Sequence, residues 1–97
     1  MMIEEIRANR VSIFLEALDE GMSMFYKLGW FIFYKDGVLY QTSFSEHLER
    51  DVTHKSDISI NALLEHIHSL SDDELKNIYG GIRLLRMQRK IYDREYQ

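Results

Sequence analysis

The sequence predicts a small α+β domain in which an N-terminal helix precedes an antiparallel β-hairpin and two C-terminal helices. Three patterns carry this prediction: helical periodicity towards both ends, a central aromatic segment interrupted by Asp-Gly, and a helix-capping pattern near residue 71. Helices gathered beside an antiparallel hairpin fit the two-layer packing of this class. Because 97 residues is the usual length of one domain, we expect residues 1–97 to fold as a single unit.

Residues 3–26 have the period of a helix. Apolar side chains recur there at intervals that place them on one helix face: Val11, Phe14, Leu15, Leu18, Met22 and Phe25. Glu4 and Glu5 near the start suit the positive end of the helix dipole. Gly21 is about 1 kcal/mol less favourable in a helix than alanine, so we expect the helix to end or bend there.

Residues 29–35 and 38–44 form the predicted hairpin. Both segments are rich in the aromatic and β-branched side chains that favour strands. Asp36-Gly37 lies between them, where a two-residue type I′ turn favours this pair. The resulting register pairs Lys35 with Val38, Tyr34 with Leu39, Phe33 with Tyr40, and Phe31 with Thr42.

Strand alternation gives the hairpin two apolar faces. One face carries Phe31, Phe33, Val38, Tyr40 and Phe44, and the other carries Trp30, Ile32, Tyr34 and Leu39 with polar Gln41 and Ser43. An isolated two-stranded hairpin is barely stable in water, so helices of the same chain, a second copy or a partner protein must cover both faces. We expect the second face, which Gln41 and Ser43 dilute, to be the partner or dimer interface, formed by Trp30, Ile32, Tyr34 and Leu39.

The last third of the chain predicts two helices. Residues 45–57 are polar, with at most one helical turn after Ser45, and residues 59–69 have a helical apolar stripe. Ser71 followed by Glu74 is a capping-box pattern, which marks the start of a final helix over residues 72–94. Gly80-Gly81 inside that helix indicates either a break or the close approach of another backbone.

Charge is divided unevenly along the chain. Residues 76–97 have a net charge of +4, and residues 1–75 have a net charge of −8. We expect residues 86–97 to project as a basic helical tail. Arg83, Arg86, Lys90 and Arg94 share one helix face, which suits contact with nucleic acid or an acidic partner, although a solvated face or ion pairs within the chain are the more common explanation of such a pattern.

No catalytic residue, metal ligand set or cofactor motif is recognisable. Cysteine is absent, which excludes disulfides and thiolate chemistry, and His66 and His68 would point apart on a helix. The adjacent acidic pairs suit helix ends, and no serine lies in a nucleophile-elbow pattern. We therefore predict no enzyme activity, no metal and no cofactor.

The leading hypothesis is a small protein-interaction module, an inhibitor, adaptor or regulator, with a protein partner and a possible homodimer. The alternative is a nucleic-acid-binding regulator that uses the basic helix. Small regulators carried by phages and plasmids share these gross properties, which is an analogy only. The acidic start lacks secretory features and no apolar run reaches the length of a membrane span, so we expect a cytoplasmic protein without membrane contact.

Overall fold

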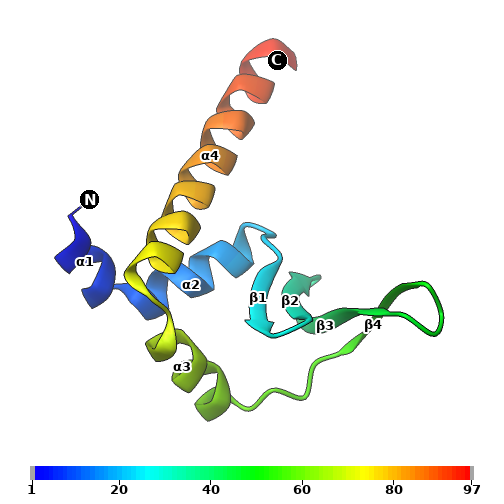
Figure 1. Ribbon diagram of the computed structural model, residues 1–97. Coiled ribbons are helices and arrows are strands. Elements are labelled where there is room, and N and C mark those ends of the chain that lie inside the picture. Colours follow the sequence, from blue (N-terminus) through cyan, green and yellow to red (C-terminus); the bar gives the residue numbers. More distant parts are fainter. Residues whose placement is uncertain (1, 97) are drawn as a thin grey trace.

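The structure, a computed structural model, describes residues 2–96 and the side chains of residues 2–94 (Figure 1). The described chain runs through α1 (Ile3–Ala8), α2 (Arg10–Asp19), β1 (Met24–Lys27), β2 (Trp30–Lys35), β3 (Val38–Ser45), β4 (Arg50–Lys55), α3 (Ile60–Ser69) and α4 (Asp72–Tyr96). The strands form one antiparallel sheet in the order β1-β2-β3-β4. The predicted α+β class is confirmed; residues 1 and 97 of the predicted domain and tail lie outside the described residues.

The predicted helix over residues 3–26 ends near Gly21, as expected, and the prediction is wrong for the residues that follow. It is divided into α1 and α2 at Asn9, whose side-chain Nδ2 donates a hydrogen bond to the Glu5 carbonyl. It ends after Asp19 because Gly21 adopts a φ of 86°, a conformation that glycine reaches without the strain of a side chain.

Residues 24–27 are a strand instead of the last turn of a helix. In β1, Met24 and Tyr26 are buried while Phe25 and Lys27 are exposed, which is the alternation of a half-buried strand. Met24 pairs with Ile32 and Phe25 pairs with Phe31. The helical spacing of Phe25 from the α2 residues was therefore coincidental.

The central hairpin has the predicted strands, turn and register. Every predicted pair between β2 and β3 is present, from Phe31 opposite Thr42 to Lys35 opposite Val38. Asp36 and Gly37 have φ values of 53° and 77°, the two positive values that a type I′ turn requires. The local chemistry of this segment thus determines its structure.

The predicted two-stranded hairpin is part of a larger sheet, because residues 50–55 form a fourth strand instead of irregular chain. Arg50–Lys55 pairs with β3 along its whole length. Val52 is the one apolar residue in this strand, so its sequence lacks the apolar alternation by which strands are recognised. Polar and charged side chains are typical of strands at a sheet edge, where they discourage association with other strands.

The final helix is continuous through Gly80-Gly81. Ser71 caps it as predicted, since Ser71 Oγ accepts from the Glu74 N–H at 3.2 Å and the Glu74 carboxylate accepts from the Ser71 N–H at 3.3 Å. The close neighbour of Gly81 is a side chain: the Met22 Cε atom lies 2.7 Å from the position that a Cβ atom would occupy. No neighbour lies within 4 Å of that position at Gly80.

Gly80→Ala is expected to stabilise the protein. The substitution meets open space and restricts the unfolded chain, so the free energy of unfolding should rise by about 0.5–1 kcal/mol. Thermal unfolding followed by circular dichroism measures the change. Gly81→Ala is the matched control and should gain less, because Met22 must move to admit the new methyl group.

One core joins all four helices to the first half of the sheet. Its largest fully buried side chains are Phe14, Leu18, Ile32, Ile67, Leu75 and Ile82. At the edge of the body, Arg7 of α1 holds the Asp72 carboxylate by paired hydrogen bonds, which keeps the pKa of Asp72 below its usual value. The β3–β4 hairpin and the C-terminal half of α4 extend away from this body (Figure 1).

Candidate interaction surfaces

The face predicted as a partner interface is instead the inner face of the sheet. Ile32 is 0% exposed, and Tyr34 and Leu39 are partly buried against the core. Helix α2 packs against β2 on this side. The prediction that this face lacked an intramolecular cover is therefore wrong, and Ile32 is not available to a partner.

Trp30, the fourth residue of that predicted interface, is half-buried at the margin of the core. It lines a hollow of about 410 Å³ with Gln41 of β3 and the chain that leads into α3. Its ring meets His54 of β4 edge-on, with the ring centres 5.6 Å apart. Trp30 therefore closes the side of the sheet, and this contact gives His54 a packing role.

The outer face of the sheet carries most of the exposed aromatic side chains. Phe44 is 62% exposed and Phe31 is 42% exposed, and both lie on the side opposite Ile32. Phe31 meets Phe25 edge-on at 6.0 Å, and Phe33 stacks on Tyr40 at 5.6 Å. Most of this face is left to the aromatic rings and solvent, and a helix reaches it at Phe25, whose ring lies 6.3 Å from the His66 ring of α3.

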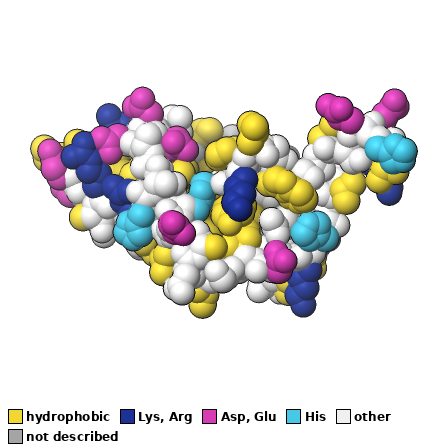
Figure 2. Space-filling model, turned by 60° about the horizontal axis from the view of Figure 1, so that its bottom comes forward, with side chains coloured by type: hydrophobic (Ala, Val, Ile, Leu, Met, Phe, Trp, Pro, Cys, Tyr) yellow, Lys and Arg dark blue, Asp and Glu magenta, His cyan; other side chains and the backbone are white. Residues whose placement is uncertain are grey.

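Figure 2 shows the molecule from the side that carries α3 and the sheet. Hydrophobic side chains gather near the middle of this view, while the projecting β3–β4 tip mixes acidic, basic, histidine and hydrophobic groups. Sequence alternation identified the two hairpin faces, but it did not identify which of them the helices cover.

Ion pairs with α2 and the residue after it engage part of the predicted basic face of α4 and leave the rest exposed. Arg86 hydrogen-bonds to Glu16, which raises the pKa of Arg86 above its ordinary value, and its Nε lies 3.7 Å from Glu20. Arg89 donates to the same Glu20 carboxylate at 2.7 Å. The sequence left ion pairing within the chain as an alternative, and the structure shows such pairs for Arg86 and Arg89.

The other basic residues of α4 whose side chains the structure describes are exposed and form no ion pair with α2. Arg83 lies 5.9 Å from the Tyr79 ring centre, and Lys76, Lys90 and Arg94 make no ion pair within the described residues. Beside them runs an exposed apolar stripe that the sequence analysis missed: Leu84, Met87 and Ile91. Its spacing of three and four residues is that of one helix face, so the sequence alone could have identified it.

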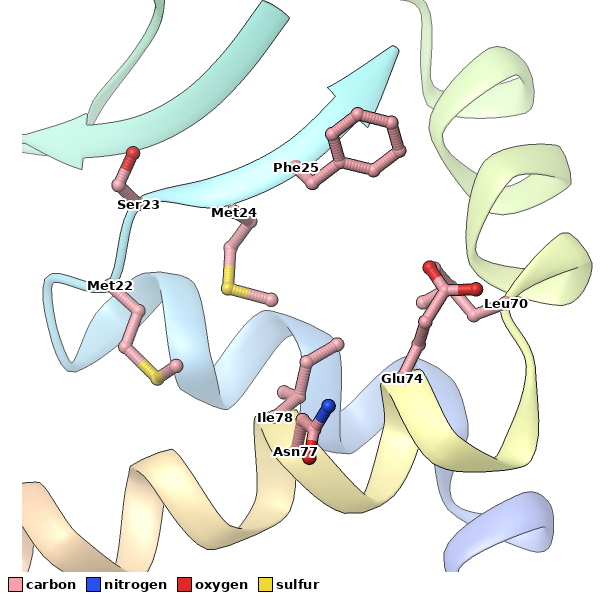
Figure 3. Close-up of a pocket in the computed structure, with 8 residues that line it drawn as sticks. All are labelled: Met22, Ser23, Met24, Phe25, Leu70, Glu74, Asn77 and Ile78. Carbon is pink, nitrogen blue, oxygen red and sulfur yellow. The ribbon is translucent and has the colours of Figure 1, made fainter. Parts of the chain in front are cut away.

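A pocket of about 230 Å³ opens between β1, the segment before it and the start of α4 (Figure 3). Its walls are mainly apolar: Met22, Met24, Phe25, Leu70 and Ile78, with Ser23, Glu74 and Asn77 among them. The Glu74 carboxylate is engaged in the helix cap. The pocket therefore offers apolar contact, and it lies next to the aromatic outer face through their shared residue Phe25.

The described residues contain no group of three or more histidine and carboxylate side chains placed to hold a metal ion. His66 is engaged in a hydrogen bond instead, because its Nε2 donates to the Phe25 carbonyl at 3.0 Å and its ring covers the edge of β1. Among residues 2–96, no helix combines the length and apolarity needed to cross a lipid bilayer. Comparison with protein families, curated proteins and solved structures finds no match to this chain.

Proposed function

We propose that this chain is a non-enzymatic protein-interaction module, an adaptor, inhibitor or regulator, that self-associates through the outer face of its sheet. The observation that supports this function most directly is the aromatic outer face, defined by Phe25, Phe31, Phe33, Tyr40 and Phe44, of which Phe25, Phe31 and Phe44 are 45%, 42% and 62% exposed. Contiguous exposed apolar surface of this kind marks interaction sites in proteins.

The surface area of the chain supports the same proposal. The chain exposes 7237 Å², about 1,400 Å² more than the roughly 5,800 Å² expected of a compact protein of its mass. Its radius of gyration of 15.0 Å similarly exceeds the value of about 12.5 Å for a compact chain of this length. A standard interface buries about 800 Å² on each partner, so the excess is large enough for one.

A second copy of the chain is the occupant that the charges of the outer face favour. Asp51 and Lys55 lie on this face of β4, on either side of Thr53, whose hydroxyl bonds to Thr42 at 3.0 Å. A two-fold axis near Thr53 would place Asp51 of each copy opposite Lys55 of the other. Reciprocal pairing of this kind is characteristic of two-fold dimers.

The double variant Phe31→Ser/Phe44→Ser is expected to remain folded and to lose self-association. Sedimentation equilibrium over a concentration series measures the dimer constant, which should weaken at least about 100-fold when two central aromatic residues are removed. Leu28→Ser/Leu48→Ser is the matched control, since these exposed leucines lie outside the face, and it should dimerise like the wild type. A wild type that stays monomeric throughout, or a double variant that still dimerises, would contradict the proposal.

A charge exchange identifies the arrangement within the dimer. Asp51→Lys alone should weaken association by bringing like charges together, and adding Lys55→Asp should restore it. If the two substitutions instead weaken dimer association additively in the exchanged variant, Asp51 and Lys55 do not face each other.

Nucleic-acid binding through α4 stays as the alternative function, supported by the outward Arg83, Lys90 and Arg94. The apolar stripe beside these residues favours a protein contact, because phosphate offers Leu84, Met87 and Ile91 nothing to pack against. The absence of cysteine fits the reducing cytoplasm, where we place the module in this proposal.

A further inference from the structure

Helix α4 carries a second unpartnered surface, separate from the sheet. Leu84, Met87 and Ile91 are about half-exposed and follow one another at intervals of three and four residues. These intervals place them along one face of the helix, on the side opposite the buried Leu75 and Ile82. The stripe therefore cannot pack against the body of its own chain.

Near the end of the stripe, the helix surface has the shape that receives a side chain from another helix. Met87, Lys90, Ile91 and Arg94 line a hollow of about 190 Å³. These are positions i, i+3, i+4 and i+7, the four residues that surround each inserted side chain where two helices pack knobs into holes. The occupant that fits this geometry is another helix.

The charges beside the stripe specify the chemistry of that helix. Lys76, Arg83 and Lys90 recur every seven residues and so form a nearly straight row along one side of it, with Arg94 beyond them. None of the four forms an ion pair within the described residues. A second α4 would add an identical basic row to the contact and no row of carboxylates to pair with it, which is unfavourable.

We propose that the outward face of α4 binds an amphipathic helix of a partner protein, with an apolar stripe flanked by acidic side chains. The Leu84–Met87–Ile91 stripe packs against the apolar residues of that helix, and Lys76, Arg83, Lys90 and Arg94 pair with its carboxylates. The inference rests on the proposed function only in taking the partner to be a protein. It needs no dimer, because the α4 stripe and the aromatic face lie on different elements.

A synthetic probe tests the proposal without knowledge of the partner. The probe is a fluorescent three-heptad peptide with leucine at the a and d positions and glutamate at e and g, where like charges keep it from pairing with itself. Its control has lysine in place of each glutamate. Fluorescence anisotropy should show binding of the glutamate peptide at least about tenfold tighter than the lysine peptide, and binding should weaken as salt rises.

Two variants locate the contact. Met87→Gln/Ile91→Gln should abolish binding and leave helix content unchanged, since both side chains are exposed in the free chain. Arg83→Glu/Lys90→Glu should reverse the preference in favour of the lysine peptide. Lys27→Glu/Arg50→Glu makes the same change of net charge at exposed sites away from α4 and should leave the preference intact.

Three results would overturn the inference: no binding of the glutamate peptide, equal binding of both peptides, or self-association of the chain that Met87→Gln/Ile91→Gln abolishes. Tight binding of duplex DNA that Arg83→Glu/Lys90→Glu removes, with no peptide binding, would assign the basic row to phosphates instead. Running the peptide titration on Phe31→Ser/Phe44→Ser separates the two proposals, because the helix contact should survive loss of the sheet contact.

Discussion

Ile32→Ala is expected to lower the free energy of unfolding by about 2–5 kcal/mol, the usual cost of truncating a fully buried isoleucine. Ile32 is 0% exposed and lies at the centre of the sheet, paired with Met24 on one side and Gln41 on the other. Its side chain packs in the core that the helices form, so alanine would leave a cavity that the surrounding rigid elements cannot fill. A loss of this size is comparable to the whole stability of a small domain.

The neighbouring Phe31 provides the matched control, since it lies on the same strand and points to the opposite side of the sheet. Phe31→Ala removes a larger side chain but should cost only about 1 kcal/mol, mostly the edge-on contact with Phe25. Urea denaturation of both variants at a protein concentration below the dimer constant measures the two losses without a contribution from association. Equal losses would mean that both faces of the sheet are covered within one chain.

The central hairpin could be predicted to the level of individual residue pairs because its determinants are local. Asp36-Gly37 fixes the turn, the turn fixes the register, and alternation then assigns each side chain to a face. The start of α4 was predictable for the same reason, because Ser71 and Glu74 cap the helix through hydrogen bonds three residues apart.

The two outer strands were missed because their partners, more than their own residues, determine their structure. Met24–Lys27 is short and extends an apolar helical pattern, so its pairing with β2 outweighs a misleading local period. Arg50–Lys55 has almost no apolar alternation and is a strand because β3 offers it a complete edge. Pairing with a neighbouring strand leaves little trace in the pattern of a segment's own residues.

Local sequence patterns also could not show which face of the hairpin the helices cover. Gln41 and Ser43 suggested that their face meets water, yet Gln41 lies directly opposite the fully buried Ile32, and both polar residues are partly buried. The basic face of α4 posed a similar problem, since Arg83 and Arg86 are close on the helical wheel. Only the positions of Glu16 on α2 and Glu20 directly after it show that Arg86 pairs within the chain while Arg83 does not.

Ile82→Ala is expected to lower the free energy of unfolding by about 2–5 kcal/mol, whereas Ile91→Ala should change it by no more than about 0.5 kcal/mol. The two isoleucines lie on the same helix and undergo the same chemical change. Ile82 is 1% exposed and belongs to the core, while Ile91 is 54% exposed on the projecting half of α4. Alanine at residue 91 also improves helix propensity, which offsets the little apolar contact that is lost.

Urea denaturation of both variants measures the difference, and each kcal/mol should correspond to a shift of about 4–8 °C in the midpoint of thermal unfolding. A large loss for Ile91→Ala would mean that the projecting half of α4 is already packed in the free protein, against a second copy or a part of its own body. The outward stripe would then be closed to an acidic helix. A small loss leaves the stripe open, so that any effect of Ile91 on partner binding can be read separately from its effect on folding.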